Sequence, residues 1–429
     1  MHQILFCLLI TMGSAAANPF FIGRFDGLDS GPTDQSAFST YWNPAAIAQE
    51  GGSAQIHLLL VDRQASFDRV AELNDVPPEW AHINAGKNTT GALGTVPGLA
   101  ARYGFSVGDF TVGLGLAAFV DRAGTSHWKR NLGAPSEYPG AIDGPQRWSV
   151  LNSMLVVLSP AASLAVAHAP SGFSVGVTPI MNFVSLSTVK AINPDRSERV
   201  VDDAGRLAEG RIFLEDATDE QLTAVVGVRY EGLDNAVFGL TWHSGVDYAL
   251  IGRGRLAFGV AEEAVVNALI NLPVAQSVRF GVDLRLSPRW ILRPMVSWAD
   301  WSVMERQGAI NLANGESLMD LPREWADSWS GRVRLDCLAS ESVRLTVGAA
   351  YETGVTPSHA FDPGLSEADN WEASVGVSVA LGAAYRLSSS FTWQQYADVT
   401  VTDSVNKPLT NGHYTDQRQY LTLDLEVTL

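Results

Sequence analysis

The sequence predicts an all-β protein, a 14-stranded antiparallel transmembrane β-barrel with an N-terminal hatch in its lumen. Three observations support this fold class: apolar and polar residues alternate with period two, short and long connections alternate along the chain, and no apolar stretch approaches the roughly 20 residues of a membrane helix. In a closed barrel every backbone polar group pairs with a neighbouring strand, which hydrocarbon requires.

The N-terminus has the pattern of a secretory signal. An apolar run from Ile4 to Ile10 is followed by the small residues Ser14 to Ala17, which predicts cleavage near Ala17. Beyond the signal, Cys337 is the only cysteine, so an intramolecular disulfide is excluded. We expect three parts: a signal peptide (1–17), an N-terminal hatch or plug (18–51) and the transmembrane barrel (52–429).

The predicted hatch centres on Tyr41 to Ala48. Proline fixes its own φ and keeps the preceding residue out of the helical region, so Asn43-Pro44 predicts a turn. Trp42 and Ile47 flank this turn with apolar surface, which suits a compact plug.

Strand periodicity is clearest in the second half of the chain. Alternate residues from Val278 to Leu286 are apolar, while Arg279, Asp283 and Arg285 fall on the other face. The same pattern recurs at 332–337, 342–351 and 421–429. A soluble sandwich would also alternate in this way.

The connections favour a barrel over a sandwich. Short turns are expected at 107–109, 170–172, 232–235, 287–288, 339–342 and 387–389. Long connections are expected at about 64–97, 121–147, 191–220, 250–276, 305–327, 356–370 and 403–415. This alternation gives 14 strands with both chain termini on the short-turn side, the periplasmic side of outer-membrane barrels. Tryptophans near strand ends suit the aromatic girdles of such barrels: Trp148, Trp242, Trp290, Trp298, Trp301, Trp325 and Trp371.

Charge narrows the function. The net charge of -17 argues against nucleic acid as a partner, because phosphates require a basic face. The eight histidines are scattered, and none stands in a pattern typical of a nucleophile with its base or of a metal site, so we predict no enzyme, no catalytic residue, no metal and no cofactor.

Several collinear segments resemble the FadL/TodX-like family of outer-membrane transporters of hydrophobic compounds. They are the hatch motif Asn43-Pro44-Ala45, the early strand 112–116, the strand pair 277–302 ending in Asp-Trp-Ser, and the Trp-x-Asp-x-Trp of 325–329. The chain departs from the family in ending on Leu429 where an aromatic residue is usual.

The resemblance implies passive uptake through a plugged barrel with lateral exit, most simply of long-chain fatty acids. It implies that Asn43, Pro44 and Ala45 contact the strand at about 109–120, where Gly113 and Gly115 are candidate kink positions. The ligand-pocket candidates are Phe20, Phe21 and Arg323. It further implies a Gram-negative outer-membrane location, a monomer, and contacts with membrane lipid, lipopolysaccharide and the barrel-assembly machinery.

Alternatives stay open. The chain is also compatible with an aromatic-hydrocarbon channel of the same family, or with a surface receptor or structural barrel that transports nothing. The inward arginines at 279, 285, 332, 334 and 344 are expected to form salt bridges that fill the lumen rather than to bind ligand. The acidic loop from Asp195 to Glu220 is expected to be a solvated surface loop, with binding of divalent cations as the alternative.

Overall fold

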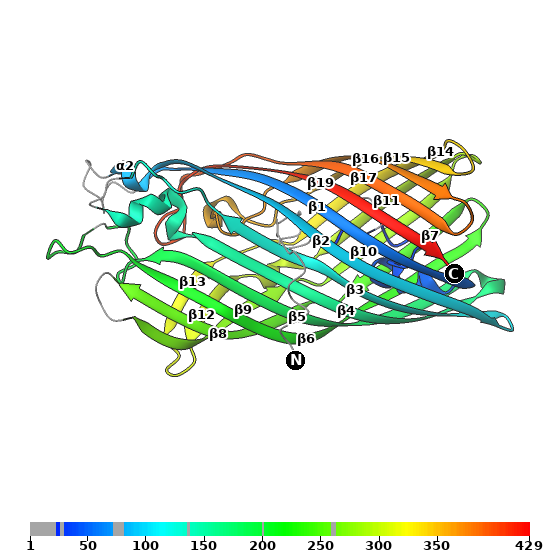
Figure 1. The fold of residues 1–429 in the computed structure, drawn as a ribbon, viewed down its shortest axis with the longest axis horizontal. Coiled ribbons are helices and arrows are strands. Elements are labelled where there is room, and N and C mark those ends of the chain that lie inside the picture. Colours follow the sequence, from blue (N-terminus) through cyan, green and yellow to red (C-terminus); the bar gives the residue numbers. More distant parts are fainter. Residues whose placement is uncertain (1–22, 26–29, 72–80, 135–137, 200, 259–262) are drawn as a thin grey trace.

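The alternating segments form one closed antiparallel sheet in the computed structural model (Figure 1). The structure describes residues 23–25, 30–71, 81–134, 138–199, 201–258 and 263–429. The strands are β1 (Gly51–Arg69), β2 (Gly86–Val107), β3 (Phe110–His127), β4 (Asn152–His168), β5 (Phe173–Ile192), β6 (Gly210–Leu233), β7 (Ala236–His243), β8 (Val246–Phe258), β9 (Ala264–Val274), β10 (Ser277–Arg285), β11 (Trp290–Ala299), β12 (Arg306–Asn311), β13 (Ser317–Pro322), β14 (Ser328–Leu338), β15 (Val343–Glu352), β16 (Asn370–Leu381), β17 (Tyr385–Tyr396), β18 (Val399–Val401) and β19 (Gly412–Thr428).

Five pairs of segments are successive parts of one strand, so the barrel has the predicted 14 strands. For example, the upper part of β6 pairs with β8 and its lower part pairs with β7. The ring closes where β1 pairs with β19, from Ser53↔Thr428 to Arg69↔Gly412. A closed ring leaves no strand edge in the membrane.

Five of the six predicted short turns are confirmed, but the turn at 387–389 is wrong. The chain turns between Leu381 and Tyr385, around Gly382 with a φ of +74°. Leu387 to Ser389 lie inside β17, where Ser388 donates to Ser378 Oγ at 2.8 Å. Serine is common in turns, but here serines supply lumenal hydroxyl groups. The long connections lie where predicted, and all but one are shorter than expected because the strands continue beyond the expected ends. The exception is the connection predicted at 356–370, which begins earlier because β15 ends at Glu352.

Aromatic side chains form a level girdle on the outer face of the barrel. Trp298 is opposite Trp329, and Tyr351 is opposite Trp371, on neighbouring strands. The prediction that Trp148, Trp301 and Trp325 belong to the girdle is wrong. Each of these side chains is at most 3% exposed and packs inside the protein. These three indoles instead fill space inside the long-loop half of the barrel. The aromatic residues that remain on the outer face are suited to contact with lipid.

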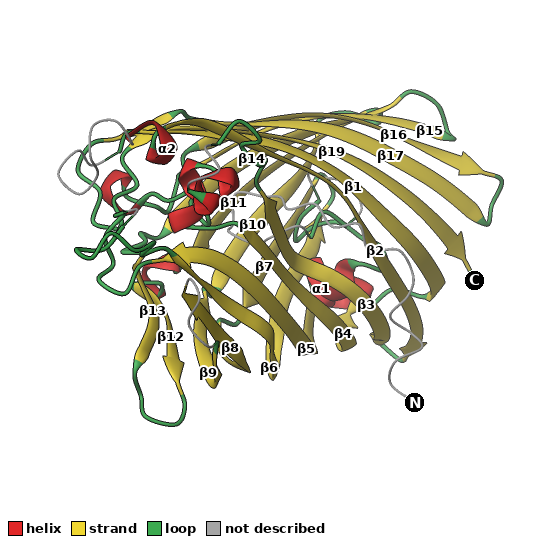
Figure 2. Ribbon diagram, turned by 60° about the vertical axis from the view of Figure 1, so that its left-hand side comes forward, coloured by secondary structure: helices red, strands yellow, loops and turns green. Residues whose placement is uncertain are grey.

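The N-terminal segment contains the short helix α1 (Ser39–Trp42) and a 3-10 turn (Pro44–Ile47), and α2 (Ala81–Asn84) lies among the long loops. Figure 2 shows α1 within the ring of strands. Ser39 to Ile47 are buried throughout. None of the helices in the described part of the chain has the length and apolar character needed to cross a membrane.

Candidate functional site

Asn43 organises the segment that occupies the lumen. Its side-chain Oδ1 accepts from Ala45 N at 3.1 Å and caps the turn that Pro44 begins. Its Nδ2 donates to Pro32 O at 2.7 Å and to Val228 O on β6 at 3.1 Å. Proline suits the first position of such a turn because it has no N–H to satisfy. One amide therefore shapes the turn and binds it to the wall.

A belt of inward-facing small residues lies beneath this turn. Register pairing connects Gly104 to Gly113, Gly113 to Ala165, Ala165 to Gly176, and Gly176 to Gly227 across five neighbouring strands. We call these five residues the glycine belt. A Cβ at Gly176 would lie 2.5 Å from Pro44 C, and one at Gly227 would lie 1.9 Å from Asn43 Oδ1. The belt thus lets hatch backbone touch strand backbone.

The contacts of the hatch motif differ from the expectation. Asn43, Pro44 and Ala45 lie against β5 and β6, at Gly176 and Gly227, and not against β3. The residues that meet β3 are Ile47 and Thr40, at Gly113 and Gly115 respectively.

The predicted kinks at Gly113 and Gly115 are also corrected. Both residues pair regularly with β2 and β4, and the register shift of β3 lies further along, between Val120 and Arg122. The two glycines serve close approach of the hatch, since a Cβ at Gly115 would lie 2.7 Å from Thr40 Oγ1. Close approach and strand bending are both reasons for glycine in a strand, and only coordinates separate them.

Ion pairs hold the opposite side of the hatch. Asp34 binds Arg293 at 2.5 Å and Arg334 at 2.6 Å. Burial alone would raise the pKa of Asp34, but Arg334 and Arg293 hold that pKa well below its usual range. Arg24 binds Glu372 at 2.8 Å and lies over the ring of Tyr420. This side therefore depends on charge and not on close backbone packing.

A cavity, which we call the main cavity, lies in the long-loop half of the lumen. Its apolar lining includes Leu155, Leu186, Ile270, Leu272, Met319 and Leu321. Its charged lining comprises Arg63, Lys190, Arg323, Asp362, Glu367 and Arg418. The cavity thus has an apolar wall beside six charged side chains, which suits a ligand with an apolar part and a charged group better than a purely apolar ligand.

Arg323 lines this cavity as predicted for a ligand-pocket residue, but its charge is already satisfied. It forms an ion pair with Asp362, and its guanidinium also donates to Gln307 Oε1 at 2.7 Å and to Leu365 O at 2.9 Å. Asp362 lies in the loop after β15, a partner that sequence spacing does not indicate. Arg323 is therefore a structural part of the cavity wall.

Lys190 is the cation that the sequence reasoning missed. It lies near the end of β5, is 9% exposed, and forms no hydrogen bond or ion pair with the residues that the structure describes. Arg418, by contrast, binds both Glu367 at 3.2 Å and Asp416 at 3.0 Å. A buried ammonium group without a direct partner favours an anionic ligand group beside it.

Glu367 is the acid of this cavity whose pKa is shifted toward neutral pH. Burial raises the pKa of Glu367 to about 7, although Arg418 acts in the opposite direction. Its Oε2 is buried without a hydrogen-bond partner among the described residues. The charge of the cavity therefore changes near neutral pH.

The family model of the outer membrane protein transport proteins (OMPP1/FadL/TodX) matches residues 149–427. The chain belongs to this family. Its members are outer-membrane transport channels for hydrophobic compounds and not enzymes, which locates this barrel in a Gram-negative outer membrane with its short turns toward the periplasm.

Solved structures of FadL/TodX proteins share the fold. A FadL homologue from Pseudomonas aeruginosa superposes with a TM-score of 0.79 at 15% identity, over 95% of this chain and 99% of that chain. The toluene transporter TodX of P. putida gives 0.68 at 14% identity, over 96% and 99%. The toluene transporter TbuX of Ralstonia pickettii gives 0.66 at 14% identity, over the same shares. No curated protein sequence matches the chain.

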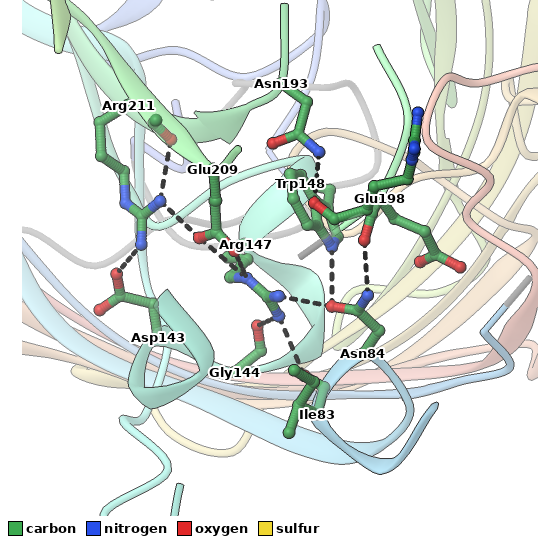
Figure 3. A network of polar contacts seen from close by, with 12 residues as sticks. Ile83, Asn84, Asp143, Gly144, Arg147, Trp148, Asn193, Glu198, Glu209 and Arg211 are labelled. Atoms are coloured by element: carbon green, nitrogen blue, oxygen red, sulfur yellow. Dashed lines mark hydrogen bonds and ion pairs between the residues drawn. The ribbon is translucent and has the colours of Figure 1, made fainter. Parts of the chain in front are cut away.

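A buried polar network joins three extracellular loops of this FadL/TodX barrel (Figure 3). Arg147 donates to Ile83 O at 3.0 Å, to Gly144 O at 3.1 Å and to Glu209, and Arg211 binds Asp143 at 2.7 Å. Glu198 pairs with Arg69 and is fully buried. The expectation of a merely solvated acidic loop is thus wrong for two of its acids, Glu198 and Glu209.

The remaining predictions concern Phe20 and Phe21, the inward arginines, and metal binding. Phe20 and Phe21 lie outside the described residues. Among the inward arginines, Arg332 and Arg334 have acidic partners as expected, whereas Arg279 binds His243 Nε2 at 2.8 Å. Within the described ranges, no three His, Cys, Asp or Glu side chains gather as they would to hold a metal ion.

Proposed function

We propose that the protein takes up long-chain fatty acids, with the carboxylate bound by Lys190 and the chain lying in the apolar part of the main cavity. The observation that supports this proposal is the absence of a direct partner for Lys190 among the described residues, in a cavity whose other cations have acidic partners. A hydrocarbon needs only the apolar wall, whereas a fatty acid also needs a cation.

In this proposal residues 18–51 act as a hatch that blocks straight passage, and the ligand leaves sideways through the wall. A gap in the backbone pairing of β4 with β5 supports an exit near β3 to β5. Pro160 and Pro179 lack an N–H, and between Leu158 and Leu164 the pairing of β4 with β5 is reduced to Ala161↔Ile180. The register shift of β3 at Val120 is close by, since Ala118 pairs with Pro160.

Assembly follows the family pattern in our proposal. The signal peptide is cleaved near Ala17, the barrel-assembly machinery inserts the chain, and the protein works as a monomer surrounded by lipid and lipopolysaccharide.

Binding to the detergent-purified protein tests the substrate. Lys190→Met should weaken binding of a long-chain fatty acid about tenfold or more, because a charged hydrogen bond is lost, and should leave an alkane of the same length unaffected. Lys129→Met is the matched control, because Lys129 is exposed on a loop. Unchanged fatty-acid binding by Lys190→Met would exclude this carboxylate site.

Aromatic hydrocarbon is the second candidate substrate, and a side pocket favours it. This pocket of about 440 Å³ adjoins the main cavity at Arg63 and Asp362, and its walls include Trp128, Phe361, Tyr396 and Tyr414. If toluene binds more tightly than fatty acid and is insensitive to Lys190→Met, the aromatic assignment replaces the first. Offset ring stacking would then provide the selectivity.

A further inference from the structure

A second cavity lies at the periplasmic end, between the hatch and the wall formed by β14 to β17 and β19. Residues of the N-terminal segment that line it include Ser30, Asp34 and Gln35. Hydroxyl groups dominate its lining, from Ser374, Ser378, Ser388, Ser390, Thr346 and Thr422. It differs from the main cavity in being polar, so water and small solutes fit it better than a hydrocarbon chain.

Most acids of this cavity already have partners. Asp34 and Asp336 are bound by Arg293 and Arg334, and Thr346 also donates to Asp336 at 3.0 Å. Asp424 contacts His57 Nδ1 at 2.7 Å. These acids are therefore occupied by groups other than Arg344.

Arg344 has no acid within ion-pair distance in the described part of the chain, and its Nε is buried without a hydrogen-bond partner there. The charged groups that act on it are one carboxylate, Asp336, and three guanidinium groups, those of Arg293, Arg334 and Arg386. Arg334 is neutralised by Asp34 and Asp336, and Arg386 lies near Glu426, so Arg344 is the one guanidinium group of this cavity without an acid at ion-pair distance among the described residues.

Strand register places a hydroxyl group between two of these cations. Ser378 on β16 is directly opposite Arg344 on β15, and Ser388 on β17 is directly opposite Ser378. Arg386 Nη1 lies 3.5 Å from Ser378 Oγ, and its acid neighbour Glu426 is only weakly engaged at 3.7 Å. Two guanidinium groups and one hydroxyl group therefore line the same polar space.

We propose that Arg344, Arg386 and Ser378 form a periplasmic binding site for a small oxyanion, a carboxylate or a phosphate. Guanidinium groups bind the oxygens of such anions in paired hydrogen bonds, and the serine hydroxyl adds a donor. The anion comes either from the periplasm as a free solute or from the head of a transported ligand. The site does not depend on Lys190 and is separate from the main cavity.

Titration calorimetry with inorganic phosphate, in an uncharged detergent at low ionic strength, tests the site. The full-length wild-type protein should bind phosphate, and Arg344→Gln should weaken binding about tenfold or more. Ser378→Ala should weaken it by a smaller factor. Arg289→Gln is the matched control, because Arg289 is exposed at a periplasmic turn and the same charge is removed.

Soaking crystals with tungstate gives an independent readout, with an anomalous peak expected between Arg344 and Arg386. Heat-modifiable migration on gels should show that all variants are folded. Absence of phosphate binding in the wild type, or equal weakening by Arg289→Gln, would overturn the proposal. Competition identifies the source: displacement of phosphate by a fatty acid in the Lys190→Met variant points to the ligand head, and no displacement points to a free solute.

Discussion

The hatch meets the two sides of the barrel in different ways. Toward β2 to β6 it packs backbone against backbone over the glycine belt, and Asn43 and Gln35 add hydrogen bonds to β6. Toward β11 and β14 it is held by Asp34 and two arginines, beside the polar periplasmic cavity. Close packing tolerates almost no displacement, whereas ion pairs can reform over some distance. We infer that the hatch is fixed on the glycine side and adjustable on the ionic side.

A side chain introduced into the glycine belt should weaken the docking of the hatch more than any other change proposed here. A Cβ at Gly227 would overlap Asn43 Oδ1 at 1.9 Å, so Gly227→Val should displace the hatch and cost about 3 kcal/mol of its docking free energy. Limited proteolysis of the N-terminal segment measures this as faster cleavage, with the barrel still heat-modifiable. Gly331→Val is the control, because nothing lies within 4 Å of a Cβ there. Equal protection of Gly227→Val and wild type would contradict the fixed side.

Removing the ionic anchor should have a smaller effect. In Asp34→Asn, Arg293 and Arg334 keep Asp336 as a partner, so we expect a loss of only about 1–2 kcal/mol and a modest rise in the proteolysis rate. Asp403→Asn, in an exposed loop, provides the comparison. A loss as large as that of Gly227→Val would show that the ionic side is equally rigid.

The pH dependence of this anchor has a definite sign. The pKa of Asp34 is lowered, so its stabilising charge is present at neutral pH and is lost only as the pH falls below the usual carboxyl range. Protection of the wild-type hatch should therefore be equal at pH 7 and at pH 5.

The smallest expected effect is the pH dependence of ligand binding in the main cavity, which depends on Glu367 and not on Asp34. The pKa of Glu367 is raised to about 7, so lowering the pH from 8 to 6 neutralises it and removes a repulsion toward an anionic ligand. Binding of a long-chain alkylsulfonate, whose own charge does not change, should tighten about threefold over this range. Glu367→Gln should reduce the pH dependence without abolishing it, because the ammonium group of Lys190 lies in the same cavity and also responds to pH, and Asp34→Asn should leave the pH dependence unchanged. Tighter binding at pH 8 than at pH 6 would refute this assignment. Besides Arg418, the charged groups that act on Glu367 include Asp416, Arg63 and Glu352.

Sequence patterns predict the barrel better than its interior. Period two and turn spacing give 14 strands, because both depend on residues close together in the chain. The glycine belt is also visible in principle, since Val-Gly-Val at 175–177 and 226–228 puts glycine on the inward face of β5 and β6. The prediction of kinks at Gly113 and Gly115 overlooked that an inward glycine can also allow another backbone to approach the strand closely.

The charges of the lumen could not be predicted in the same way. Arg323 is paired with Asp362 and Lys190 has no direct partner among the described residues, yet nothing in their local sequence distinguishes them. The difference arises from loops that fold back into the barrel, and loop paths leave no periodic pattern. Side-chain pairing across the lumen therefore requires coordinates.

The seam between β1 and β19 limits the order in which the molecule can assemble. β1 begins at Gly51, only a few residues after the 3-10 turn that ends at Ile47, and it pairs with β19 at the far end of the chain. Once β1 and β19 have paired, the wall around the hatch is continuous. The glycine belt must therefore receive the hatch before or during the last strand pairing, so a chain that closes early with the hatch outside would be trapped in a misassembled state.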